Sequence, residues 1–133
     1  MDVLLRTNDP GAKLALRNIS GGPHGMQFML TASSRGFSGE LSQSLESSEL
    51  RQLLVGLREM HRTLQGSAEL RTHGEADGAT LTIDKLGRVK VDVTMVHYGD
   101  PVHRLQISFF SDQSCLPAFI QELEAAAASS GCL

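Results

Sequence analysis

The sequence predicts an α+β fold: a mainly antiparallel sheet in the element order βββ-α-ββββ-α, with two helices packed on one face. Several segments alternate apolar and polar residues, the period-two pattern of strands. Two other segments place apolar residues three and four positions apart, the pattern of amphipathic helices. Alternation buries one face of a sheet and leaves the other exposed, so we expect one polar sheet face in contact with solvent.

Three short strands open the chain, at about residues 13–19, 26–33 and 37–44. The residues between the first two, Ser20-Gly21-Gly22-Pro23, are typical of a turn, and Ser34-Arg35-Gly36 is a tight connection. The segments therefore predict a meander of hairpins.

The first helix is expected at about residues 47–64, where the leucines recur at helical spacing. Ser47 or Ser48 can cap its start, and Gly66 is expected to stop it. Gly56 is unfavourable inside a helix, and we interpret it as a site where the helix approaches the sheet closely.

Four more strands follow, at about residues 67–72, 79–84, 88–98 and 102–110. Asp84-Lys85-Leu86-Gly87 predicts a hairpin turn in which glycine supplies a positive φ. The polar sides of the last two strands should share the exposed sheet face. These side chains are Arg88, Lys90, Asp92, Thr94, Arg104, Gln106 and Ser108.

The last helix should begin near Ser111-Asp112-Gln113-Ser114, with Asp112 or Ser114 as its cap and Pro117 in its first turn. The Ala- and Ser-rich segment from about 125 to 133 is expected to fray. The 133 residues fit one domain, 1–133.

Composition and charge argue against some classes of binding partner, such as nucleic acids and membranes. The net charge is −3, the pI is about 5.9 and the basic residues are scattered, so the sequence does not predict nucleic-acid binding. No apolar run approaches the ~20 residues of a membrane span, and no signal peptide is recognisable. Cys115 and Cys132 match no ligand or redox motif, so we expect free thiols and a cytoplasmic protein.

No catalytic motif is present, and we expect neither an enzyme nor a cofactor. His97 and His103 flank a turn and should lie across a hairpin from each other, where two histidines either bind a metal or simply border the turn. We favour the second interpretation and expect no metal site. Cys115 lies at a helix start, where the dipole favours a thiolate, and this is the one feature that a cysteine-dependent hydrolase would use.

Residues 50–123 resemble the WapI-like immunity group of bacterial polymorphic-toxin systems. The resemblance lies in the leucine-rich helix, in Leu64-Gln65-Gly66-Ser67-Ala68-Glu69-Leu70, in Gly87-Arg88-Val89-Lys90-Val91 and in Phe110-Ser111-Asp112-Gln113-Ser114-Cys115-Leu116. It implies a non-catalytic cytoplasmic protein that binds and occludes a cognate toxin domain. The resemblance to this group assigns no catalytic residue to the present sequence.

Two groups of residues are candidates for the contact with a toxin. One lies on the exposed sheet face: Arg88, Lys90, Asp92, Arg104 and Gln106. The other surrounds a turn: His97, Tyr98, Asp100 and His103. The alternatives are a small ligand-binding module, or a homodimeric accessory module joined through an exposed edge strand, and then the hydrolase. The sequence leaves monomer and homodimer open.

Overall fold

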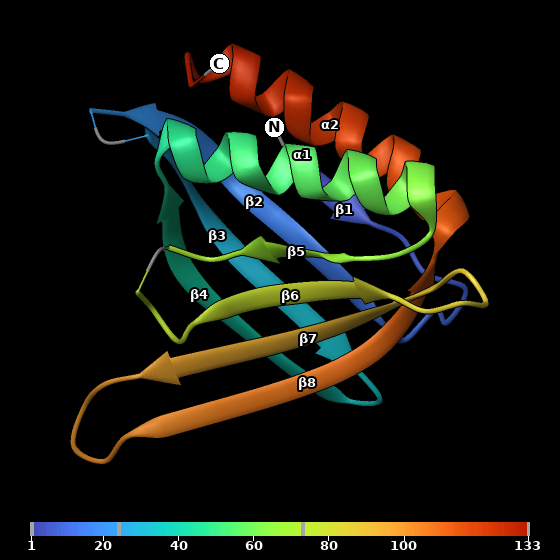
Figure 1. The fold of residues 1–133 in the computed structure, drawn as a ribbon. Helices are drawn as coiled ribbons and strands as arrows, with labels where there is room; N and C mark the ends of the chain where they lie inside the picture. Colours follow the sequence, from blue (N-terminus) through green and yellow to red (C-terminus); the bar gives the residue numbers. More distant parts are fainter. Residues whose placement is uncertain (1, 24, 73, 133) are drawn as a thin grey trace.

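The computed structural model describes residues 2–23, 25–72 and 74–132, and it confirms the α+β class and the element order (Figure 1). The strands are β1 (Val3–Leu5), β2 (Lys13–Gly22), β3 (Gly25–Ser34), β4 (Phe37–Leu45), β5 (Ser67–Leu70), β6 (Gly78–Ile83), β7 (Arg88–His97) and β8 (His103–Asp112). The helices are α1 (Ser47–Thr63) and α2 (Leu116–Ser129), and a 3-10 turn, η1 (Gln113–Cys115), precedes α2.

The strands form two sheets, whereas the sequence led us to expect one. β1 to β4 make a four-stranded N-terminal sheet and β5 to β8 make a four-stranded C-terminal sheet, each an antiparallel meander. The helix α1 connects the two, because it separates β4 from β5 along the chain. β1 was not predicted: it has three residues and pairs with β2, placing Val3 opposite Leu16.

The two sheets form a wedge that the helices fill. β3 contacts β8 and β4 contacts β7, so the sheets cross at this end. At the other end α1 packs on β5, α2 packs on β1, and the two helices lie side by side (Figure 1). The sheets approach closely at Gly39, where a Cβ would lie 2.5 Å from Cδ2 of Leu105. One continuous apolar cluster joins both sheets and both helices.

The apolar stripe of α1 faces this core, as predicted. Its buried residues are Leu50, Leu53, Leu54, Leu57 and Met60. Gly56 does mark a close approach, because a Cβ there would lie 3.0 Å from Cβ of Ala68 on β5. The predicted serine cap is wrong: the N-cap is Glu46, whose backbone N–H donates to the Glu49 carboxylate at 2.8 Å.

The helix α1 ends at Thr63 with Leu64 as its C-cap, two residues before Gly66, which the sequence predicted as its stop. Leu64 has a φ of 56°, in the left-handed region, and its N–H donates to the carbonyl oxygen of Met60 at 2.9 Å. Gly66 follows with a φ of 101°. A leucine in the left-handed region costs roughly 1–2 kcal/mol, which glycine would avoid.

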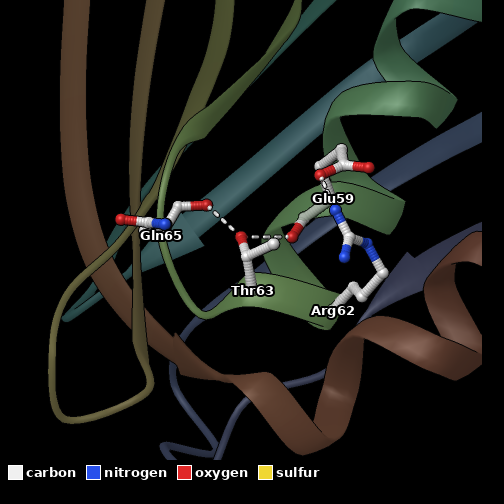
Figure 2. A network of polar contacts seen from close by, with 4 residues as sticks. All are labelled: Glu59, Arg62, Thr63 and Gln65. Atoms are coloured by element: carbon white, nitrogen blue, oxygen red, sulfur yellow. Dashed lines mark hydrogen bonds and ion pairs between the residues drawn. The ribbon is translucent and has the colours of Figure 1, made fainter.

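Polar contacts surround this helix end (Figure 2). Arg62 and Glu59 form an ion pair at 2.7 Å on the solvent side. The hydroxyl of Thr63 lies 2.7 Å from the carbonyl oxygen of Glu59 and 3.3 Å from that of Gln65, to which it can donate. These bonds fasten the chain as it leaves the helix toward β5.

The helix α2 continues into the segment whose composition predicts fraying. We expected fraying from about residue 125, but α2 continues to Ser129, and Ala126, Ala127 and Cys132 are buried. Cys132 N–H donates to the Ala127 carbonyl oxygen at 2.9 Å. A Cβ on Gly21 would lie 2.0 Å from the carbonyl oxygen of Ser130, so small residues let this segment pack against the end of β2.

Candidate interaction surface

The exposed side of β7 and β8 carries the first predicted group. We call it the outer face of the C-terminal sheet, and define it by Arg88, Lys90, Asp92, Thr94, Arg104, Gln106, Ser108 and Phe110. Antiparallel register places Lys90 opposite Phe110, Asp92 opposite Ser108, and Thr94 opposite Gln106. Opposite residues in an antiparallel pair project to the same side. The structure therefore brings the predicted side chains onto one surface; whether that surface binds a partner stays a prediction.

Arg88 is held in place at one end of the outer face. Its guanidinium contacts the Asp84 carboxylate at 2.8 Å and lies 4.8 Å from the centre of the Phe110 ring. Desolvation acts to raise the pKa of Asp84. Hydrogen bonds from the backbone N–H and the guanidinium of Arg88, and from the backbone N–H of Leu86, outweigh it and lower that pKa below 3.8. The sequence had predicted this turn for its glycine, and Gly87 has a φ of 80°.

The middle of the outer face is polar and weakly paired. The hydroxyl of Ser108 donates to the Asp92 carboxylate, and Nζ of Lys90 lies 3.9 Å from the same oxygen. The Lys90 side chain remains 52% exposed. Exposed pairs of this kind are worth roughly 0–1 kcal/mol, so the charges stay available to a partner.

Toward the hairpin end, Arg104 and Gln106 are exposed. Val96 lies opposite Arg104 and is buried although its strand position points outward. The loop after β5 borders this region, because the Asp77 carboxylate accepts the Val96 N–H at 2.8 Å on the β6 side of β7. The outer face is therefore bounded on one side by that loop.

Sequence reasoning missed two contributors. Phe110 is 48% exposed, and its position follows the same alternation that had identified Ser108, so it could have been named. Arg71 donates to the Thr80 hydroxyl at 2.6 Å from beyond the end of β5. No pattern in the sequence predicts that second contact, because it depends on the path of a loop.

The second predicted group is at the β7–β8 connection. Tyr98 is 68% exposed and Asp100 is also exposed. His97 and His103 pair across the hairpin as predicted, with ring centres 6.2 Å apart in an edge-on arrangement. By strand alternation these histidines project to the side opposite Arg104, so the structure does not merge the two groups into one patch.

Within the part of the chain that the structure describes, no further metal ligands accompany the histidine pair. In residues 2–23, 25–72 and 74–132, no group of three or more His, Cys, Asp or Glu side chains is arranged to hold a metal ion. His97 and His103 therefore border the turn without a third ligand from the described part of the chain.

Cys115 packs at the edge of the core at the start of α2 and is partly buried. Among the described residues its thiol has no hydrogen bond to a histidine. His103 lies at the other end of β8, nine residues from Asp112 and so roughly 30 Å away along the strand. The geometry does not place that histidine within reach of the thiol.

A polar hollow with a volume of about 610 Å³ lies elsewhere on the molecule. It extends across the β2–β4 part of the N-terminal sheet to the loop after β5, and sequence reasoning did not identify it. Polar side chains dominate its lining, among them Gln43, Glu75 and Asp77. The side-chain oxygen of Gln43 is buried without a hydrogen-bond partner in the described residues. Serines at alternate positions of β4 were the available signal, because small side chains leave a sheet surface hollow.

No helix in the described residues combines the length and the apolar character needed to cross a membrane. A comparison with curated proteins gives no match, and a comparison with solved structures gives none either. A family model does match. It is that of the Immunity protein WapI-like family, and it covers residues 26–129, from β3 through α2, a longer stretch than residues 50–123, which carried the resemblance in the sequence. A match over most of the chain, on both sheets and both helices, means that this protein belongs to the Immunity protein WapI-like family.

Proposed function

We propose that this chain is a non-catalytic immunity protein that binds a cognate bacterial toxin domain in the cytoplasm and occludes it. The match of residues 26–129 to the immunity family carries this proposal. The expected partner is a protein, and the mechanism requires no cofactor. Inhibition by occlusion needs a stable scaffold and a complementary surface, and no catalytic group takes part.

The fold supplies such a scaffold. The core is continuous through both sheets, so the outward side chains of β7 are mounted on a strand whose other side is fully packed. A standard interface covers about 800 Å² on each partner, with a few anchors near its centre. A backbone that is already held in a packed sheet needs no ordering on binding, which reduces the entropic cost of association.

The outer face of the C-terminal sheet is the surface we favour for the toxin. It combines exposed cations, at Arg88, Lys90 and Arg104, with an exposed aromatic ring at Phe110. Arginine and aromatic side chains are enriched among residues that dominate binding energies. The second group, His97, Tyr98, Asp100 and His103, is a separate candidate at the hairpin end, because its histidines project to the opposite side of the sheet.

The test begins with the toxin domain encoded next to this chain. The purified domain should co-purify with this protein at a fixed stoichiometry, and its toxic activity should fall to background once one equivalent is added. The protein alone should turn over none of the toxin's substrate. A toxin domain that neither binds nor loses activity would contradict the proposal, and a toxin domain from an unrelated system serves as the control for specificity.

A further inference from the structure

The four sheet edges are protected unequally. The helices α2 and α1 pack on the short edge strands β1 and β5. At the β4 edge, the Thr72 hydroxyl donates to the carbonyl oxygen of Ser44 at 2.6 Å. β8 is ten residues long, contacts β3 where the sheets cross, and donates a side-chain hydrogen bond from the Ser111 hydroxyl to the Arg6 carbonyl oxygen. Among the described residues, however, β7 is its only strand partner, and no backbone–backbone hydrogen bond reaches its other side. A long unpaired edge presents a row of N–H and C=O groups that can bind another strand.

The alternation of hydrogen bonds along the β7–β8 ladder identifies which backbone N–H and C=O groups of β8 are free. Gln113 N–H donates to the carbonyl oxygen of Gly87 at 3.0 Å, one step beyond the pair of Arg88 and Asp112. In an antiparallel ladder, alternate pairs exchange backbone hydrogen bonds. The odd-numbered residues of β8 therefore bond to β7, and the even-numbered ones point their backbone groups away from it. The latter are Arg104, Gln106, Ser108, Phe110 and Asp112.

This free edge is complementary to itself. When two copies pair antiparallel, one register engages all five free residues on each copy. It places Ser108 opposite Ser108, Gln106 opposite Phe110, and Arg104 opposite Asp112. A shift by two residues leaves Asp112 without a strand partner and sets Arg104 against Phe110. The register with the most backbone bonds is therefore also the one that places opposite charges at both ends.

We propose that two copies of this chain form a homodimer by pairing β8 with β8 about a two-fold axis at Ser108. Arg104 has no ion pair among the described residues and is exposed. The carboxylate of Asp112 accepts bonds from Ser114 and keeps lone pairs for an arginine. Pairing also brings the exposed Phe110 ring against Gln106 of the second copy.

The dimer extends the candidate surface for the toxin. The two C-terminal sheets become one eight-stranded antiparallel sheet, since each has four strands. Their outer faces then form one continuous surface. The dimer does not rest on toxin binding, because its evidence is the edge itself, and it can be tested without any toxin.

Light scattering after size-exclusion chromatography, over a range of concentrations, measures the mass of the full chain. We expect a dimer of twice 14.4 kDa that dissociates on dilution. Ser108→Pro should give a monomer, because the proline ring blocks the edge while the ladder to β7 loses no bond. Ser42→Pro is the matched control. Ser42 lies in phase with Ser44 on the β4 edge, where the free groups also point outward, so this variant should remain dimeric.

A cysteine pair gives a second measurement that does not depend on how well the proline variant folds. Residues opposite each other in a hydrogen-bonded antiparallel pair lie about 5.5 Å apart at Cα, within the range of a disulfide. Mild oxidation of Ser108→Cys should therefore yield a covalent dimer. Ser42→Cys and the wild-type chain, with its own two cysteines, should not.

Three results would overturn the proposal. The first is a wild-type chain that is monomeric at every concentration. The second is a dimer that persists in Ser108→Pro and does not cross-link through Ser108→Cys, because another surface must then join the copies. The third is a monomeric chain whose toxin binding is lost in Ser108→Pro but kept in Ser42→Pro, which would assign the β8 edge to the toxin.

Discussion

The apolar stripe of α1 and the outer face of the C-terminal sheet use side chains in opposite ways. In α1, five side chains have an exposed fraction of 2% or less and pack against the core. On the outer face, the charged side chains of Arg88 and Lys90 stay more than half exposed and form only surface ion pairs. Burial of a leucine contributes about 1.5–3 kcal/mol, whereas an exposed ion pair contributes roughly 0–1 kcal/mol. The apolar stripe of α1 therefore contributes to stability as part of the core, whereas the outer face contributes little to it and is free to serve binding.

The largest effect is expected in α1. Leu54→Ala should lower the free energy of unfolding by roughly 2–5 kcal/mol, because it leaves a cavity at a position only 2% exposed. The neighbouring Val55→Ala is the control: Val55 is 57% exposed, and its loss should cost no more than about 0.5 kcal/mol. Urea denaturation measures both. Equal losses would show that the packing of α1 is not as described.

A smaller effect of opposite sign is expected at the end of the same helix. Leu64→Gly should raise the free energy of unfolding by about 0.5–1 kcal/mol. Relief of the left-handed backbone outweighs both the extra freedom of glycine in the unfolded chain and the loss of a side chain that is 39% exposed. Thermal unfolding followed by circular dichroism would detect the gain. A clear loss would place Leu64 among the packed residues.

On the outer face, charge reversal should hardly change stability. Arg88→Glu and Lys90→Glu should each lower the free energy of unfolding by no more than about 1 kcal/mol, because the ion pairs that they break are exposed. Denaturation under the conditions used for Leu54→Ala checks this. A loss above about 2 kcal/mol for either variant would mean that the outer face supports the fold and would remove the contrast with α1.

The smallest expected effect is a change in how the stability of the fold depends on pH in the acid range. The pKa of Asp84 is lowered in the folded protein, so its ionised form stabilises the fold above its ordinary value of 3.8, and this contribution disappears as the pH falls through the lowered value. Asp84→Asn should therefore be slightly less stable than wild type at neutral pH and should lose less stability below about pH 4. Melting temperatures measured from pH 7 to pH 3 test the sign. A parallel pH dependence for both proteins would contradict it.

Much of the fold was predictable because alternation and helical spacing depend only on neighbouring residues. Val91 and Lys90 lie on opposite sides of β7 as the pattern indicated, and Leu53 and Leu57 face the core. The division into two sheets was not predictable, since alternation shows which side of a strand is buried and not which strand lies beside it. β1 was missed for a similar reason: a strand of three residues carries almost no periodic signal.

Most of the side chains that share the outer face could be predicted from the sequence, whereas the loop contacts around that face could not. Alternation placed Arg88 and Arg104 on one side correctly. The contact of Arg71 with Thr80 and the hydrogen bond from Val96 to Asp77 depend on a loop whose path no local pattern encodes. The two histidines were placed opposite each other because a hairpin register can be counted from its turn.

Calorimetric titration measures whether the outer face of the C-terminal sheet binds the toxin, as we propose. The toxin domain encoded beside this chain would be titrated with wild type, with Arg88→Glu/Lys90→Glu, and with Lys13→Glu/Arg17→Glu. The Lys13→Glu/Arg17→Glu variant is the control, because it makes the same charge reversal at two exposed positions on β2 of the other sheet. We predict that the Arg88/Lys90 variant loses at least about tenfold in affinity, or 1.4 kcal/mol, while the Lys13/Arg17 variant binds like wild type. Unchanged binding by the first variant, or an equal loss in both, would contradict the claim.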